Sequence, residues 1–303
     1  MATETDTTSG SVERTGVLAR VDGWLDEETT VRRAIVVYAV IGVFMAFLLL
    51  PVVYMVLVTF TGRAFLYSPQ LIPAVSDLSI ENYRQVLSRG AFQSYFVNSV
   101  VIASSTTILT LTVGSLAGYS LSRFDYPGRD SLIVAFLGTQ MLPYVLILIP
   151  FFLLMFTLNL INTRVGIILA HSVIATPLAT WLLKGYFDDI PQSLDEAAKM
   201  DGCSQLDVLV RVVLPLSIPG IAVAGFYTFT VSWNDFLLVS VLSQTADTRT
   251  LPLGLQLFQS QNQVAWHLVL TAAVVTMAPV ILLFALVQKW VVEGLGSGGM
   301  KGV

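Results

Sequence analysis

Six long stretches without a charged residue constrain the fold of this chain more than any other feature of its sequence. A charged side chain is costly at the centre of a bilayer, and a helix needs about 20 apolar residues to cross one. Each uncharged stretch is long enough to hold one crossing. The predicted spans lie within 34–60, 96–121, 132–154, 165–183, 212–242 and 268–287.

The composition indicates the same class of protein. Of the 303 residues, 55% are hydrophobic and only 12% are charged, whereas an ordinary soluble domain carries about 25% charged residues. This scarcity of charge excludes disorder, a coiled coil and most soluble enzymes. A net charge of −4 without a basic run excludes a nucleic-acid partner. One Cys and two His are too few for a Cys/His metal site, so we expect an all-α membrane protein that binds no metal.

The distribution of Lys and Arg predicts the orientation of the six helices. Cytoplasmic segments carry an excess of these residues. With the N-terminus inside, eleven of the sixteen Lys and Arg residues fall on the inner side. We therefore expect both termini in the cytoplasm, with a tail over 1–33, a six-helix domain over 34–290 and a second tail over 291–303. Within the first tail, 17–25 has the pattern of an interfacial amphipathic helix, and a partly ordered tail explains it equally well.

The third inner segment, 184–217, has its own pattern of helix starts and stops. Ser193 with Glu196 three residues later forms a capping-box pattern, and so does Ser204 with Asp207. Gly202 lies between them, at a position suited to a left-handed backbone. We expect a helix through Met200, a bend at Gly202 and a second helix that stops at Leu214-Pro215. A rigid elbow without catalytic groups is suited to mechanical coupling, in which it fits a groove on a partner and transmits a push to the adjacent spans.

The same segment resembles a known motif. Glu196-Ala197-Ala198, Gly202, Val212 and Leu214-Pro215 have the spacing of the EAA loop of ATP-binding-cassette importer permeases, with Val212 where that family usually has Ile. Further matches over 96–302 resemble the permease of maltose-type sugar importers. They are Phe96-Val97-Asn98-Ser99, Tyr126-Pro127-Gly128-Arg129, Asn162-Thr163, Trp181-Leu182-Leu183, Trp233-Asn234-Asp235-Phe236, Thr250-Leu251-Pro252 and Gln288-Lys289-Trp290.

This resemblance implies a fold, partners and site residues. The implied fold is the type I importer permease in a prokaryotic plasma membrane. The implied partners are a second permease, a pair of ATPase subunits that use ATP and Mg, and an extracytoplasmic solute-binding protein. In the family, the C-terminal tail of the permease reaches the ATPase. The resemblance therefore implies a contact with the ATPase at Gly299 and Lys301. The implied ATPase-coupling residues are Glu196, Ala197, Ala198, Asp201, Gly202, Leu214 and Pro215.

The chain itself has no pattern for ATP hydrolysis. A phosphate-binding loop reads Gly-x4-Gly-Lys-Ser/Thr. The nearest match, Gly294-x4-Gly299, is followed by Met300, and no strand is expected before it. We therefore expect a transport subunit that is not an enzyme and binds no cofactor of its own.

Asp235 is the acidic residue that falls inside a predicted span. Intramembrane ionisable residues usually face a cavity or another helix. Trp233, Asn234 and Asp235 together offer an aromatic face and hydrogen-bonding groups that suit a polyol near the outer gate. A hydrogen bond between helices is the simpler explanation for Asp235, and packing explains other polar groups in spans. The remaining candidates for the translocation path are Gln140, Tyr144 and Tyr227.

Other functions remain open from the sequence. The sugar-importer permease is the leading hypothesis, and a permease for glycerol phosphate or a polyamine is the alternative within the same class. The lack of Lys or Arg inside a span argues against an anionic substrate. An ion-coupled secondary transporter usually shows internal repeats, and none is evident. A membrane-bound enzyme lacks support, because no catalytic triad, metal cluster or carboxylate pair lies on one span.

Overall fold

The computed structural model describes residues 27–258 and 264–299, and these form helices and short helical turns, with an isolated β-bridge between Thr61 and Leu78. The predicted interfacial helix at 17–25 lies outside the described residues, and the division into 1–33, 34–290 and 291–303 stays a prediction. The helices are α2 (Glu27–Thr59), α3 (Glu81–Leu87), α4 (Gly90–Arg123), α5 (Arg129–Thr139), α6 (Tyr144–Thr157), α7 (Arg164–Asp188), α8 (Gln192–Met200), α9 (Gln205–Val208), α10 (Leu214–Leu216), α11 (Ile218–Asn234), α12 (Leu237–Leu242), α13 (Leu251–Gly254) and α14 (Trp266–Gly299).

Length and apolar composition identify the spans. Parts of α2, α4, α7 and α14 are each long and apolar enough to cross a membrane. Two bent pairs, α5 with α6 and the 205–216 segment with α11, bring the number to six if each pair is one span. The expected six-helix, all-α membrane fold is thereby confirmed for the described residues.

The third span departs from the straight helix that we expected over 132–154. It consists of α5 and α6, whose axes differ by 99° across a break after Thr139. Pro143 directly precedes α6. A proline disfavours helical backbone at the residue before it, here Leu142, and this explains why the helix ends before the break.

The fifth span does not continue to 242 as one helix, so that expectation is wrong. Helix α11 ends at Asn234, Asp235 adopts an extended backbone, and α12 begins at Leu237. The Asp235 carboxylate accepts a hydrogen bond from the backbone N–H of Leu238 at 3.1 Å. Because an aspartate side chain competes for backbone N–H groups, Asp235 ends one helix here and satisfies an N–H in the first turn of the next.

The chain divides into two compact units, 1–57 and 58–303. In the first unit, α2 is a long helix whose composition is apolar enough to cross a membrane. In the second unit, the short helix α3 is attached to the chain that precedes it. Its Asn82 amide donates to the backbone oxygens of Thr59 and Thr61 at 2.9 and 2.8 Å.

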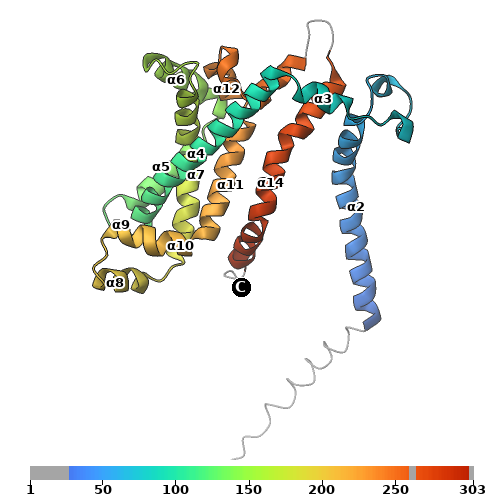
Figure 1. Cartoon of the computed structure of the whole chain (residues 1–303). Helices are drawn as coiled ribbons and strands as arrows, with labels where there is room; N and C mark the ends of the chain where they lie inside the picture. Colours follow the sequence, from blue (N-terminus) through green and yellow to red (C-terminus); the bar gives the residue numbers. More distant parts are fainter. Residues whose placement is uncertain (1–26, 259–263, 300–303) are drawn as a thin grey trace, which may run out of the picture. The chain divides into compact units, whose positions relative to one another are not determined.

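Helices α4 and α7 form the most extensive helix contact of the second unit and lie side by side in Figure 1. Gly114 and Gly118 of α4 face α7. A Cβ atom at Gly118 would lie 3.2 Å from both the Thr180 oxygen and the Lys184 nitrogen of the α7 backbone. The Gly-x3-Gly spacing therefore permits the close backbone approach for which such motifs are known.

The first turn of α7 packs equally closely on the turn before it. Thr163 caps the helix, because its Oγ1 accepts a hydrogen bond from the Gly166 N–H at 3.0 Å. A Cβ atom at Gly166 would overlap the carbonyl oxygen of Leu160. Only glycine fits at this position without a shift of the backbone.

Candidate functional site

The elbow, defined here as residues 192–216, bends at Gly202. Gly202 has φ +87°, which is the left-handed region expected from the sequence. Nothing lies within 4 Å of the place where a Cβ atom would be. The backbone conformation, rather than the available space, is therefore what favours glycine there.

The two expected capping boxes fare differently. Ser204 and Asp207 form theirs: the Ser204 Oγ accepts from the Asp207 N–H and the Asp207 carboxylate accepts from the Ser204 N–H, each at 3.2 Å. The Ser204 hydroxyl also donates to the Asp207 carboxylate. This hydrogen bond and the one from the Ser204 N–H, helped by the Arg211 charge, hold the pKa of Asp207 below its usual range. The prediction of a capping box at Ser193 is wrong. Helix α8 begins at Gln192, two residues before the start that an N-cap at Ser193 would give; it follows Pro191 directly, and no side chain caps it.

The second half of the elbow runs further than we expected. It continues from α9 through a π-helical turn, Leu209–Val213, into α10, which contains Pro215. In a regular α-helix a proline clashes with the carbonyl four residues earlier. The wider π turn relieves that conflict, so the chain stays helical to Leu216 instead of stopping at Leu214-Pro215.

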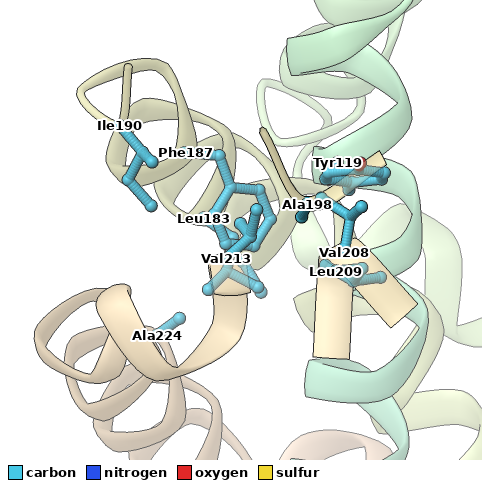
Figure 2. Packing of buried hydrophobic residues seen from close by; sticks show 10 residues of the cluster. Tyr119, Leu183, Phe187, Ile190, Ala198, Val208, Leu209, Val213 and Ala224 are labelled. Atoms are coloured by element: carbon cyan, nitrogen blue, oxygen red, sulfur yellow. The ribbon is translucent and has the colours of Figure 1, made fainter. Parts of the chain in front are cut away.

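The elbow has a buried and an exposed face. Asp195 and Ala198 of α8 are buried, as are Val208, Leu209 and Val213. Figure 2 shows the apolar members of this face packed with Tyr119 of α4 and with Leu183 and Phe187 of α7. The exposed side carries most of the predicted coupling residues, which are Glu196, Ala197, Asp201, Gly202 and Pro215; Leu214 is half-buried and Ala198 belongs to the buried face.

A buried ion pair that the sequence analysis missed fixes α8 to the end of α4. The Arg123 Nε lies 2.8 Å from the Asp195 Oδ2, and the two side chains are 6% and 5% exposed. Arg123 also donates through Nη2 to the Ile190 oxygen at 3.0 Å. No sequence signal links these residues, because Arg123 and Asp195 are 72 positions apart.

A second buried polar cluster surrounds Asp235, and it joins three spans. The carboxylate accepts a hydrogen bond from the Tyr144 hydroxyl of α6. It also lies 2.9 Å from the Nε2 of His171 in α7. The other ring nitrogen of His171 lies 2.9 Å from the Ser232 Oγ in α11. His171 thus has two hydrogen-bond partners that the sequence did not reveal.

The predicted path residues separate into two groups. Gln140 and Tyr144 both line a cavity of 840 Å³ between α4, the α5–α6 pair and α7. Its wall is mostly apolar, with Thr139, Ser172 and Thr176 as further polar groups. The Gln140 amide donates to the Ile174 oxygen at 3.1 Å, which leaves its own carbonyl oxygen available.

Trp233, Asn234 and Tyr227 do not line that cavity. Trp233 is 1% exposed, stacks on Phe229 and donates its Nε1–H to the Thr276 oxygen. Its ring therefore offers no free face in this structure. Asn234 is exposed and Tyr227 is half-buried, both on α11.

The remaining expectations concern metal and the C-terminal tail. Within 27–258 and 264–299, no group of three or more His, Cys, Asp or Glu is arranged to hold a metal ion. Gly299 is the last residue of α14, and Lys301 lies outside the described residues. The proposed tail contact thus stays a prediction.

Residues 110–296 match the family described as the inner membrane component of binding-protein-dependent transport systems. The chain is 34% identical over 258 residues to the permease protein of the trehalose/maltose transport system of Thermococcus litoralis, covering 84% of this chain and 92% of that protein. It is 35% identical over 224 residues to the sulfoquinovosyl glycerol transport permease of Agrobacterium fabrum, covering 74% and 79%.

A solved structure has the same fold. It is a bacterial ABC transporter for import of the acidic polysaccharide alginate, with a TM-score of 0.75 and 24% identity over 86% of this chain and 97% of the matched chain. The chain belongs to the family of inner membrane components of binding-protein-dependent transport systems. It is a membrane-embedded permease component of an importer.

Proposed function

We propose that this chain is the permease subunit of an ATP-driven importer for a sugar or oligosaccharide. It forms half of the translocation path and couples to a separate ATPase through its elbow. The relatives named for trehalose/maltose and for sulfoquinovosyl glycerol transport support the substrate class. The partners are a second permease, a pair of ATPase subunits that bind ATP and Mg, and an extracytoplasmic binding protein. The chain itself hydrolyses no ATP.

The observation that carries the proposal is the two-faced elbow. Its buried face is fixed to α4 and α7, whereas its outer face presents Glu196 and Ala197 together with two uncovered apolar side chains. Met200 is 88% exposed and Leu206 is 64% exposed. A rigid base with an exposed mixed surface suits a contact that receives a push from another subunit, since uncovered apolar groups mark protein contacts.

The cavity beside Gln140 and Tyr144 is the proposed part of the path that this chain contributes. An aromatic ring and a carbonyl oxygen complement the apolar face and hydroxyl groups of a sugar. Asn234 and Tyr227 share a face of α11, seven residues apart, and we assign them to the path. Trp233 and Asp235 act there by holding the wall in place. Transport follows from alternating access, as ATP-driven closure of the ATPases moves the elbow and the spans.

A charge reversal on the elbow tests this function. The tagged chain is expressed together with its partner permease, ATPase and binding-protein subunits. Both co-purification of the ATPase and ATP-driven uptake of labelled maltose and trehalose are measured. Glu196→Lys should lose both activities while the chain still inserts. Glu81→Lys is the matched control, because Glu81 is an exposed helix carboxylate on α3. Normal ATPase recovery and uptake with Glu196→Lys, or ATP hydrolysis by the isolated chain, would contradict the proposal.

A further inference from the structure

Helix α4 is held by side-chain hydrogen bonds at both ends, and none of these groups is a proposed coupling or path residue. At its inner end, Tyr119, Ser122 and Arg123 share one face, since they are spaced by three and four residues. The Ser122 hydroxyl donates to Asp188 at the end of α7 at 2.7 Å. The Tyr119 hydroxyl lies 3.2 Å from the Oε1 of Gln205 in α9.

Arg123 completes this inner attachment. It pairs with Asp195 of α8 and donates to the Ile190 oxygen just before α8. The inner end of α4 therefore touches both halves of the elbow, α8 and α9. Because the Arg123–Asp195 pair is buried, solvent screens it little, and a displacement of α8 acts directly on α4.

The outer end of α4 is attached in the same way to the loop 246–251. The Asn98 side-chain nitrogen donates to the backbone oxygens of Asp247 and Arg249 at 2.8 and 2.9 Å. The Asn98 Oδ1 accepts from the Arg164 Nε at 3.0 Å. The Ser99 Oγ accepts from the Leu251 N–H at 2.8 Å. Both side chains are buried.

Between these two attachments α4 is uninterrupted. It is a single helix of 34 residues without a proline. Among the described helices of 25 or more residues, α2, α7 and α14 each contain one, and the third and fifth spans are bent. Sharp bends in helices occur mostly at proline or at local disruptions. At 1.5 Å per residue, α4 separates Asn98 from Arg123 by about 38 Å.

We propose that α4 is a rigid strut that transmits movement of the elbow to the outer loop 246–251, with Arg123 and Asn98 as positioning residues at its two ends. The proposal rests on the proposed coupling function. When the ATPases displace the elbow, the buried Arg123–Asp195 pair moves α4. The helix, having no hinge, carries the displacement to the loop that Asn98 holds.

The test reports movement of the outer loop when nucleotide is trapped in the assembled importer. Native Cys203 is replaced by Ala, and Ala246→Cys, an exposed site in the loop, carries an environment-sensitive fluorophore. Mg-ATP with orthovanadate is added, and trapped nucleotide is counted in the same sample. In the otherwise unchanged complex we expect a fluorescence shift. Arg123→Gln should lose that shift while trapping the same amount of nucleotide.

The matched control is Arg129→Gln, because Arg129 also forms an ion pair at 2.8 Å on the inner side, but with an exposed partner, Asp125. It should keep the full shift. Arg123→Lys should keep part of it, since lysine retains the charge but not the planar fork that reaches Asp195 and the Ile190 oxygen together. Asn98→Ala should lose the shift although the elbow is unaltered. If Arg123→Gln does not assemble, Arg123→Lys and Asn98→Ala test the strut proposal in its place.

The outcomes separate the two proposals. If the unchanged complex shows trapping but no shift, the ATP-driven movement of the proposed function is contradicted, and the strut with it. If the unchanged complex shifts and Arg123→Gln or Asn98→Ala shifts equally, the strut is overturned and the proposed function stands. Loss of the shift in the Arg129→Gln control would also overturn it, because the effect would then not depend on the attachment of α4.

Discussion

Gly202 is the residue at which one added side chain tests the shape of the elbow without adding a steric contact. Its φ of +87° costs an L-residue about 1–2 kcal/mol, and nothing lies within 4 Å of an added Cβ. The cost is therefore one of backbone conformation. Among residues with a side chain, asparagine adopts this left-handed backbone conformation with the least strain. Alanine has the usual strain of about 1–2 kcal/mol, and a β-branched residue has more.

These costs set the expected order of activity. A strain of 1–2 kcal/mol reduces the population of a conformation by a factor of about 5–30. Gly202→Ala should reduce the bent conformation by that factor relative to alternatives, Gly202→Asn by less and Gly202→Val by more. ATP-driven uptake and ATPase activity stimulated by the binding protein should fall together in the order Asn, Ala, Val, measured per amount of inserted chain.

Gly128 supplies the matched control for this series. It has the same φ of +87° and also has nothing within 4 Å of an added Cβ, but it precedes α5 and lies outside the elbow. Gly128→Val should therefore carry the same strain and keep coupled transport. The reasoning fails if Gly202→Val transports like the unchanged chain, or if Gly128→Val loses coupling to the same extent.

Three further predictions concern stability. Gly166→Ala should lower the thermal stability of the purified complex by about 1–3 kcal/mol through overpacking. The same change at exposed Gly185, which has open space around it, should raise that stability by about 0.5–1 kcal/mol. Equal effects of the two changes would be inconsistent with the close packing at the start of α7. Asp235→Ala leaves the buried ring of His171 without its Nε2 partner, so thermal unfolding should show a loss of about 1–3 kcal/mol, and an unchanged midpoint would argue against the cluster. Ser204→Ala removes the cap of α9 and should cost about 1 kcal/mol, which faster amide exchange in α9 would reveal and unchanged exchange would refute.

Features that depend on neighbouring residues were predictable from the sequence. The capping box of Ser204 and Asp207 and the left-handed Gly202 are both local, because each involves residues within a few positions of one another. The breaks in the third and fifth spans were missed, although Pro143 and Asp235 are the local signals that mark them. A search based on uncharged length alone cannot distinguish a straight span from a bent one.

The contacts that hold the site together were not predictable. Tyr144 and Asp235 are 91 positions apart and His171 and Asp235 are 64 apart, so no local rule pairs them. Trp233 was expected to offer an aromatic face to a sugar. It is instead buried against Phe229, because the packing of α11 turns that ring into the core.

The sequence by itself determined the membrane class, the number of spans and the presence of a capped elbow. The physical reason is that the cost of a charge in lipid, and the ability of glycine to adopt a positive φ without strain, are properties of single residues and their near neighbours. The tertiary structure decided which side chains meet. Arg123 reaches Asp195, Asn98 reaches the loop 246–251, and Asp235 reaches His171 only after the helices pack, because each of these contacts joins residues that only the fold brings together.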